Sequence, residues 1–291
     1  MKTSTFKRIA LTGKPTLEGL TDMLGKLVKL LEARKCEIVV EQKVAALLPD
    51  GRDLKAVAAD KLSEHADLVI VIGGDGSILH AGREAAPQKL PVLGINKGRL
   101  GFLTDISPDE LDAIHAVLDG EYLEEKRMLL HAQMNIDGKT QHEMTAINDI
   151  VLLPCKQTHM IEFDVVINSQ SVCRHRADGM IVATPTGSTA YALSAGGPIL
   201  HPKLNAMVLV PLAAHTLSSR PLVISDQSVV EILITDNNEI TPCVSADGQT
   251  RMELPAGSRL QIKRASDDLR LIHPKDYHYY ETLKQKLQWK G

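Results

Sequence analysis

A glycine-rich turn carries the strongest chemical signal in the sequence. Residues 73–76 read Gly-Gly-Asp-Gly and stand between the continuous apolar run 68–72 and a helix-compatible stretch that begins at Ser77. Glycines let a ligand approach the backbone closely, and N–H groups beside a helix N-terminus can hold phosphate oxygens. A carboxylate is unfavourable in such an anion site. Asp75 is therefore expected to have a task, either accepting a proton from a hydroxyl or holding a metal ion that bridges phosphates. Taken alone, the tetrapeptide is also compatible with a tight turn that Asp75 caps.

A second motif is longer and rich in hydroxyls. The apolar stretch 179–183 follows Asp178 and leads into Thr-Pro-Thr-Gly-Ser-Thr-Ala-Tyr at 184–191, with Ser-Ala-Gly-Gly-Pro at 194–198. Hydroxyls and small residues permit close contacts and hydrogen bonds to a ribose or a base, and Tyr191 could line an adenine pocket. Composition alone is equally compatible with a Ser/Thr-rich loop between strands.

A polar pair, Asn148-Asp149, interrupts an otherwise apolar run between Ile147 and Ile150. A buried polar pair must find partners. Asn both donates and accepts, and Asp accepts from hydroxyls, which suits a ribose diol. In isolation, a surface-facing or bulged strand position is the simpler interpretation. The tripeptide Asp-Gly-Gln at 247–249 most simply forms a hairpin turn.

The familiar nucleotide-binding signatures are missing from the sequence. No G-x-x-x-x-G-K-[ST] segment occurs, and no G-x-G-x-x-G follows the first apolar run. This pattern disfavours a P-loop ATPase and a typical dinucleotide dehydrogenase. The histidines show no H-E-x-x-H or related spacing and no cluster of protein metal ligands is visible, so no protein-held metal site is predicted.

Strands and helices alternate in the first part of the chain. Strands are predicted at 8–11, 37–40, 68–72 and 90–95, and helices at 17–33 and 54–64. The run Leu-Val-Ile-Val-Ile at 68–72 is typical of a strand that is buried on both faces. The alternation predicts a Rossmann-like α/β domain over residues 1–125, with a parallel sheet. The glycine turn then lies at the carboxyl end of a strand, where ligands of such sheets bind.

The pattern changes near Lys126. From there to about Ile272, short apolar runs recur roughly every ten residues, as in an all-β domain. These runs lie at 129–136, 147–153, 161–167, 180–183, 207–210, 229–234 and 260–262. Helical periodicity is nearly absent, which predicts an antiparallel β-sandwich-type domain over residues 126–272. The tail 273–291 returns toward a helical pattern and is expected to pack back on the first domain.

Composition limits the function classes. Charged residues make up 24% of the chain, aromatics only 3%, and the net charge is −3. Without a Lys/Arg block or many aromatic rings, no nucleic-acid surface is indicated. No apolar run reaches the length of a membrane span or a signal peptide, so no membrane partner is expected and the cytoplasm is the expected compartment. The four cysteines are far apart and form no C-x-x-C pair, so buried reduced thiols are expected.

Together these motifs resemble the NAD kinase family of the bacterial type. The segments that carry the resemblance are Gly-Gly-Asp-Gly at 73–76, Asn-Asp at 148–149, 184–191, 194–198 and Asp-Gly-Gln at 247–249. Leu-Gly-Phe-Leu-Thr at 100–104 and His-Pro-Lys-Asp-Tyr at 273–277 also look like this family. The glycine turn by itself is a weak signal, because diacylglycerol kinases, sphingosine kinases and phosphofructokinases carry related turns. The 184–191 segment behind it is highly specific, and the likeness spans roughly residues 68–277.

The resemblance implies ATP-dependent phosphorylation of the 2′-hydroxyl of the adenosine ribose of NAD, which gives NADP, with the active site between two domains. It implies NAD and ATP as substrates and a divalent cation, with Mg²⁺ expected, held mainly through the ATP phosphates. It also implies a homo-oligomer, a dimer or a tetramer. By the same resemblance, Asp75 is the catalytic residue, with Gly74 and Gly76 beside the nucleotide. The residues expected to bind NAD are Asn148, Asp149, His159, Arg176, Asp178, Thr189, Ala190, Tyr191, Ala192, Leu193, Ser194 and Gln249.

One position departs from the common family pattern. Many members have Glu where this chain has Asp149, and the shorter side chain moves the carboxylate by about one bond. We expect the change to alter affinity and to leave the reaction unchanged. Two other functions are considered. A lipid kinase of the diacylglycerol type shares the glycine turn, but the 184–191 segment argues against it. A non-catalytic NAD sensor would keep the pocket, and the intact Asp75 argues against that.

Overall fold

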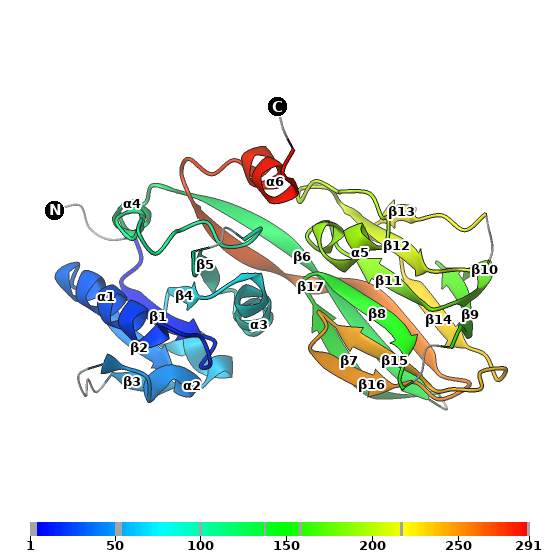
Figure 1. Ribbon diagram of the computed structural model, residues 1–291. Helices are drawn as coiled ribbons and strands as arrows, with labels where there is room; N and C mark the ends of the chain where they lie inside the picture. Colours follow the sequence, from blue (N-terminus) through cyan, green and yellow to red (C-terminus); the bar gives the residue numbers. More distant parts are fainter. Residues whose placement is uncertain are drawn as a thin grey trace. The chain divides into compact units, whose positions relative to one another are not determined.

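The computed structural model describes residues 5–49, 54–98, 101–136, 138–156, 159–215 and 218–289. The chain divides into two compact units, one formed by Met1–Lys126 with Asp268–Gly291 and the other by Arg127–Asp267 (Figure 1). Two long strands, β6 (Tyr122–Ile136) and β17 (Arg259–Pro274), begin in one unit and end in the other. No helix in the described part of the chain has the length and apolar character that membrane crossing requires.

The first unit is built on a parallel sheet with the strand order β17-β5-β4-β1-β2-β3. Its strands besides β17 are β1 (Arg8–Gly13), β2 (Glu37–Glu41), β3 (Lys55–Val57), β4 (Leu68–Ile72) and β5 (Pro91–Ile95). Its helices are α1 (Leu20–Ala33), α2 (Gln42–Ala45), α3 (Asp75–Ala85), α4 (Ala113–Leu118), α6 (Tyr279–Leu287) and the 3₁₀ helix η2 (Ala59–Glu64). Parallel neighbours need crossover connections, which place helices on the faces of the sheet.

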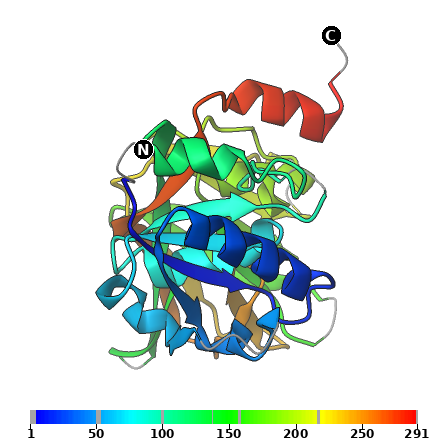
Figure 2. The same ribbon diagram turned by 90° about the vertical axis from the view of Figure 1, so that its left-hand side faces the viewer.

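Alternate residues of the central strand β4 face opposite layers. Leu68, Ile70 and Ile72 belong to the core that includes the leucines of α1, and Figure 2 shows α1 lying across the sheet on this side. The intervening Val69 and Val71 are also fully buried, and α3 packs against β4 and β5. Because helices cover both faces, every position of β4 is apolar, as its sequence predicts.

The second unit contains two groups of antiparallel strands. The first has the order β10-β9-β14-β17, with β6 paired to β17 and β7, and the second has the order β13-β12-β11-β8-β15-β16. The strands of the first group are β7 (Lys139–Ala146), β9 (Ile161–Ile167), β10 (Gln170–Ala177) and β14 (Val230–Ile234), with β6 and β17. Those of the second are β8 (Asp149–Pro154), β11 (Gly179–Ala183), β12 (Ala206–Leu212), β13 (Leu222–Ser225), β15 (Pro242–Ala246) and β16 (Thr250–Glu253). Residues from both groups, such as Val165 and Met180, share one core, which is the packing of a β-sandwich.

A second apolar layer covers the outer face of the six-stranded sheet. Ile181 of β11 and Val208 of β12 pack there with Ala192 and Leu200. These last two residues belong to the segment after β11, which includes the 3₁₀ helix η3 (Gly187–Thr189) and the single-turn helix α5 (Tyr191–Ser194). The hydroxyl-rich segment therefore folds back over the sheet that precedes it.

The predicted fold class, a Rossmann-like α/β part followed by an antiparallel β part, is confirmed. The helix predicted at 54–64 is wrong. Lys55–Val57 instead pairs with β2 as an edge strand, and only Ala59–Glu64 is helical, as a 3₁₀ helix. Pairing with β2 and burial of Val57 outweigh local helix propensity here. The strands β7, β10, β13, β15 and β16 lie outside the predicted runs, because they are short or alternate with polar residues.

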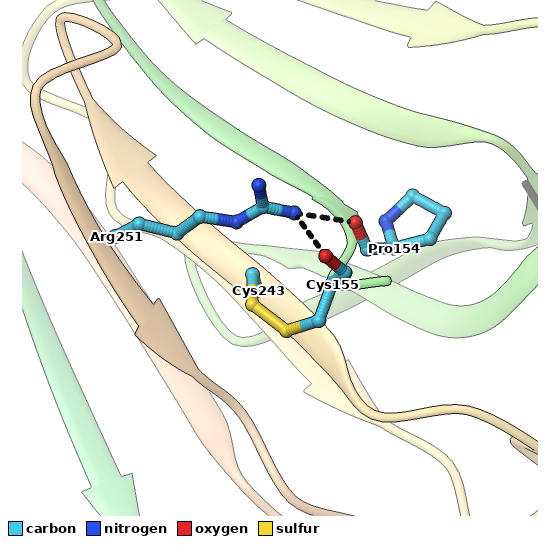
Figure 3. The surroundings of a disulfide bond; sticks show 4 residues. All are labelled: Pro154, Cys155, Cys243 and Arg251. Carbon is cyan, nitrogen blue, oxygen red and sulfur yellow. Dashed lines mark hydrogen bonds between the residues drawn. A yellow bond between two sulfur atoms is a disulfide. The ribbon is translucent and has the colours of Figure 1, made fainter. Parts of the chain in front are cut away.

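A disulfide joins Cys155 to Cys243 (Figure 3), so the prediction of four reduced thiols is wrong for this pair. The two cysteines are 88 residues apart in sequence, yet their Cα atoms lie 5.1 Å apart because β8 and β15 are antiparallel neighbours. The Arg251 guanidinium donates to the carbonyl oxygens of Pro154 and Cys155 beside the bridge, at 2.7 and 2.8 Å. Sequence spacing cannot reveal a pairing that strand register creates.

Candidate active site

The glycine turn connects β4 to α3 and places Asp75 in the first turn of that helix. Gly73 has a φ of 151°, and a Cβ atom there would lie 2.2 Å from Oγ of Ser77. Only glycine fits this position without displacing the helix start. Gly74 and Gly76 are exposed, and Asp75 is half-buried. The turn therefore presents backbone and one carboxylate at the carboxyl edge of the parallel sheet, as predicted.

Two backbone N–H groups hold the carboxylate of Asp75. Phe102 donates to Oδ2 and Leu103 donates to Oδ1, each at 3.0 Å. A Cβ atom on Gly101 would lie 2.1 Å from Oδ1 of Asp75 and 2.3 Å from Oγ1 of Thr104, so the loop approaches this closely only because residue 101 is glycine. Each carboxylate oxygen accepts one of these N–H groups and has lone-pair capacity for a further donor. The arrangement fixes the position of the carboxylate.

In the second unit, the hairpin turn between β15 and β16 organises the Asn148-Asp149 pair. Asp247 and Gly248 have φ values of 49° and 65°, and the Gln249 N–H donates to the Ala246 carbonyl at 3.0 Å, which confirms the predicted hairpin turn. The Asp247 carboxylate accepts the backbone N–H groups of Ile147, Asn148 and Asp149, at 3.1, 2.7 and 3.3 Å. Sequence reasoning assigned Asp247 only a turn, whereas the structure gives it the task of fixing the pair.

Asp149 is a buried carboxylate beside a second carboxylate. Asp149 is 5% exposed. Burial, together with the nearby charge of Asp247, raises the pKa of Asp149 to about 7. Among the residues that the structure describes, no side chain or backbone N–H donates a hydrogen bond to the Asp149 carboxylate. Such a group is stabilised by any ligand that brings hydroxyl or amide donors.

Two cavities in the second unit share Leu153 and Tyr191 in their linings. One has a volume of about 340 Å³, and the residues that line it are Asn148, Asp149, Val151, Leu153, Ala190, Tyr191, Ser245, Asp247 and Gly248. The other has a volume of about 550 Å³, and the residues that line it are Leu153, Pro154, Lys156, Asp178, Tyr191, Ser194, Ala195, Leu212 and Ala213. Tyr191 is 43% exposed. Its ring therefore stands between a carboxylate-lined cavity and a larger one that offers both Lys156 and Asp178.

Two buried hydroxyls of the 184–191 segment bond to the backbone of the protein itself. Thr184 Oγ1 donates to the Ile147 carbonyl at 2.6 Å, and Ser188 Oγ donates to the Pro185 carbonyl at 2.6 Å. A Cβ atom on Gly187 would lie 2.1 Å from the Asn148 carbonyl oxygen. The segment therefore uses these buried hydroxyls and this glycine to fold tightly against the Asn148-Asp149 backbone.

The structure places some of the predicted binding residues in the linings of these two cavities. Asn148, Asp149, Asp178, Ala190, Tyr191 and Ser194 line the two cavities. His159, Arg176 and Gln249 are exposed, Thr189 and Leu193 are half-buried, and none of these five is among the lining residues. The side chain of Ala192 packs into the outer apolar layer and is not available to a ligand.

Sequence reasoning missed three residues of this region. Gly101 permits the loop contact with Asp75, Asp247 fixes the Asn148-Asp149 pair, and Lys156 lines the larger cavity. The glycine within Leu-Gly-Phe-Leu-Thr and the aspartate within Asp-Gly-Gln were visible as motifs, but no local pattern states what their atoms contact. Lys156 carries no sequence signal of its own.

The first unit has a glycine turn and a held carboxylate at the carboxyl edge of a parallel sheet, which is where nucleotide phosphates bind in α/β folds. The second has a carboxylate-lined cavity suited to sugar hydroxyls. These features define a nucleotide-binding protein of the phosphotransferase class.

Comparison with known proteins identifies the family. Residues 9–122 match the ATP-NAD kinase N-terminal domain, and residues 147–274 match the ATP-NAD kinase C-terminal domain. The NAD kinase of Coxiella burnetii is 51% identical over 284 residues, which are 98% of this chain and 95% of the relative. The NAD kinase of Pseudomonas aeruginosa is 48% identical over 285 residues, which are 98% and 96% of the two chains. The chain therefore belongs to the ATP-NAD kinase family, which confirms the resemblance seen in its sequence.

Solved structures agree with this assignment. Yeast NADH kinase complexed with NADH matches with a TM-score of 0.89 at 25% identity, over 97% of this chain and 88% of the yeast chain. An NAD kinase from Archaeoglobus fulgidus in complex with ATP matches with a TM-score of 0.70 at 28% identity, over 98% of this chain and 100% of the archaeal one. The fold is thus shared along nearly the whole chain.

Proposed function

We propose that this chain transfers the γ-phosphoryl group of ATP to the 2′-hydroxyl of the adenosine ribose of NAD, giving NADP. Relatives about half identical to it over nearly their full length are named NAD kinase. The archaeal structure similar to it was solved with ATP, and the yeast structure with NADH. A lipid kinase and a non-catalytic sensor have no comparable support.

The observation that carries the binding proposal is the Asp149 carboxylate. It is buried, it lines a cavity together with Asn148 and Asp247, and no donor from the described residues reaches it. A vicinal diol supplies two hydroxyl donors in one rigid unit, which the two oxygens of the Asp149 carboxylate can accept. We infer that Asp149 binds a ribose of NAD, that Asn148 supplies amide contacts, and that Tyr191 lines the base pocket.

We assign the catalytic role to Asp75. Its carboxylate accepts the proton of the 2′-hydroxyl, or orients that hydroxyl, while the oxygen attacks the γ-phosphorus in line. The start of α3, which follows Gly74, is suited to phosphate oxygens because a helix N-terminus presents backbone N–H groups. Phosphoryl transfer depends mainly on positioning and charge neutralisation. The fixed position of the carboxylate on Phe102 and Leu103 is therefore as important as its basicity.

The reaction also calls for a divalent cation on the ATP phosphates. Among the described residues, no group of three or more His, Cys, Asp or Glu side chains is arranged to hold a metal ion. We propose that this cation, with Mg²⁺ as the expected ion, would be held mainly through the ATP phosphates. Once bound, it would neutralise charge on the transferred group.

We also propose a homo-oligomer, which light scattering after gel filtration would test.

A direct assay tests the function. Purified protein with NAD, ATP and Mg²⁺ should form NADP, detected with an NADP-specific dehydrogenase, and parallel reactions contain NADH or diacylglycerol in place of NAD. Phosphorylated lipid without NADP would overturn the proposal. Binding of NAD by calorimetry without turnover would support the sensor instead.

The Asp75→Asn variant tests the catalytic assignment. A general base contributes about 10²- to 10⁴-fold, so kcat should fall by at least 10²-fold with little change in thermal unfolding. Asp109→Asn is the matched control, because Asp109 is exposed on the same unit, and it should keep kcat within about twofold, as surface substitutions usually do. Near-normal turnover by Asp75→Asn would remove Asp75 from the mechanism.

A further inference from the structure

A buried histidine in the first unit lies between two carboxylates. His273, near the end of β17, is completely buried, and its Nδ1 lies 2.5 Å from Oδ2 of Asp105. Its Nε2 lies 3.7 Å from Oε2 of Glu125, and the ring of Tyr277 stacks on it with centroids 4.0 Å apart. A buried polar group of this kind needs a partner, and Asp105 supplies it at hydrogen-bond distance.

Asp105 belongs to the same short loop that holds Asp75. Residues 101–106 run from Gly101 past the N–H groups of Phe102 and Leu103 to Ile106. At its far end, Ile106 pairs with Ile95, and the Asn96 N–H donates to the Ile106 carbonyl at 2.9 Å. Asp105 is therefore only two residues along the chain from Leu103, whose N–H group is one of the two donors that fix the carboxylate of Asp75.

The sheet side of the loop leaves little room for movement. A Cβ atom on Gly94 of β5 would lie 2.7 Å from the Leu103 carbonyl oxygen, so the loop backbone rests directly on the strand. The strand β17 pairs with β5 through Ile272 and Leu93. Because His273 follows Ile272, this pairing sets the position of His273 relative to the loop. Backbone contact with β5 and the His273–Asp105 hydrogen bond are thus two separate anchors for one loop.

We propose that His273 is a positioning residue for phosphoryl transfer, which acts through Asp105 on the backbone N–H groups of Phe102 and Leu103 and through them on Asp75. The inference rests on the proposed function, in which Asp75 is the catalytic carboxylate. His273 itself touches no reacting atom in this role. Without the His273–Asp105 hydrogen bond, the loop keeps its contact with β5, but the N–H groups of Phe102 and Leu103 are no longer held in a fixed position.

Two amide variants of His273 separate positioning from packing. The side-chain nitrogen of Asn can occupy the place of Nδ1, whereas that of Gln reaches the place of Nε2, on the side of Glu125. His273→Asn should keep kcat within about threefold of wild type. His273→Gln should lower kcat by about 10- to 100-fold, the usual effect of removing a group that orients a catalytic ligand. The KM values for NAD and ATP should change by less than about threefold in both, because the lost contact acts on the carboxylate that is needed in the transition state.

Combination with Asp75→Asn decides whether the effect runs through Asp75. In that background, His273→Gln should lower the residual kcat by less than about threefold, because residues that act as one unit are not additive. A merely structural role would give the same 10- to 100-fold factor with or without Asp75. Amide hydrogen exchange, which needs no activity, should be at least tenfold faster for Phe102 and Leu103 in His273→Gln than in His273→Asn.

The outcomes are distinct. Equal kcat in the Asn and Gln variants, an additive double variant, or unchanged exchange at Phe102 and Leu103 would each overturn the proposal. If His273→Gln does not fold, Asp105→Ala replaces it in the same comparison, measured alone and together with Asp75→Asn. Asp105 is nearer the surface than His273, so its replacement disturbs the core less. Failure of wild type and His273→Asn to form NADP would refute the proposed function, while the exchange result would still report on the loop.

Discussion

Replacement of Asp149 by asparagine should stabilise the protein, and by more at pH 8 than at pH 5. Burial and the charge of Asp247 raise the pKa of Asp149 from 3.8 to about 7 in the folded protein. At pH values between these two pKa values, residue 149 has lost its proton in the unfolded chain but retains it in the folded protein. The unfolded state then binds fewer protons, so the free energy of unfolding falls as pH rises from about 4 to about 7. Asparagine has nearly the same shape and carries no charge at any of these pH values.

The size of the effect follows from the shift in pKa. A shift of roughly three pKa units corresponds to about 4 kcal/mol at pH 8, at 1.36 kcal/mol per unit. At pH 5 the folded group still holds its proton and the unfolded group has lost it, so the same linkage gives about 2 kcal/mol. These values are upper limits, because relaxation around a buried charge reduces them. The stabilisation by Asp149→Asn should therefore grow by about 2 kcal/mol between pH 5 and pH 8.

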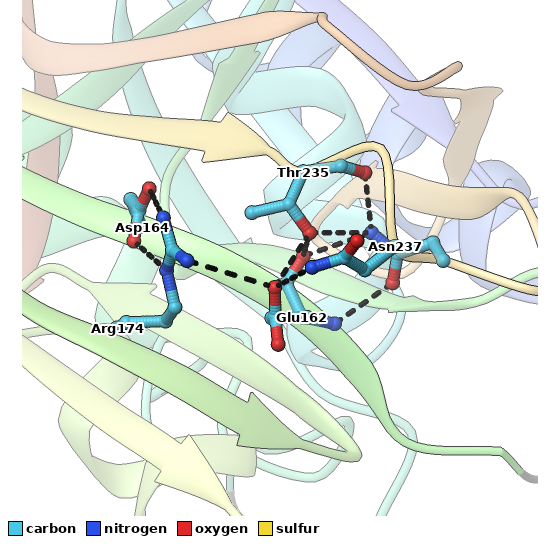
Figure 4. Close-up of polar contacts among 6 residues, drawn as sticks. Glu162, Asp164, Arg174, Thr235 and Asn237 are labelled. Carbon is cyan, nitrogen blue, oxygen red and sulfur yellow. Dashed lines mark hydrogen bonds and ion pairs between the residues drawn. The ribbon is translucent and has the colours of Figure 1, made fainter.

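Urea unfolding at the two pH values measures this difference, and Asp164→Asn provides the opposite-sign control. A hydrogen bond and ion pair with Arg174 lower the pKa of Asp164 (Figure 4). Its stabilising contribution is present above the unfolded pKa and is lost only as pH falls through the lower folded pKa. Both measurements lie above that range, so Asp164→Asn should destabilise the protein by the same amount at pH 5 and pH 8. A stabilisation by Asp149→Asn that does not change with pH would refute the reasoning.

Activity should move in the opposite direction to stability in Asp149→Asn. The carboxylate destabilises the empty protein, so its presence is explained by a contact that it makes with substrate. We expect the KM for NAD to rise at least tenfold, as removal of a charged hydrogen-bond acceptor costs about 1.5–3 kcal/mol. An unchanged KM would separate Asp149 from NAD binding and leave its burial unexplained.

Two further predictions concern backbone and covalent constraints. Gly101→Ala should lower kcat at least tenfold, because the new Cβ atom would lie 2.1 Å from Oδ1 of Asp75 and would displace that carboxylate. Misplacement of a catalytic group by about 1 Å can cost 10²-fold in rate. A wild-type kcat in steady-state assays would contradict this prediction. Reduction of the Cys155–Cys243 disulfide, which closes a loop across 88 residues, should lower the free energy of unfolding by about 2–4 kcal/mol. Thermal unfolding with and without a thiol reductant measures the loss, and a double Cys→Ser variant at these positions should not respond to the reductant.

The sequence by itself determined the kind of fold and the position of its central turn. An uninterrupted apolar run predicts a strand buried on both faces, and β4 occupies residues 68–72 as predicted. Glycines that bracket an acid predict a strand-to-helix turn, and Asp75 begins α3 there. These features depend on residues adjacent in the chain, so local pattern is sufficient to specify them. The same holds for the hairpin turn at 247–249, whose Asp-Gly pair suits positive φ values.

Tertiary structure alone decided which atoms meet. Asp247 reaches the Asp149 N–H across 98 residues, and His273 reaches Asp105 across 168 residues. Strand order and register bring these groups together, and both are set by the packing of whole sheets, in which each contact depends on many distant residues. The hydroxyls of Thr184 and Ser188 turned inward for the same reason, since a segment folded over a sheet must satisfy the buried carbonyl groups of the backbone.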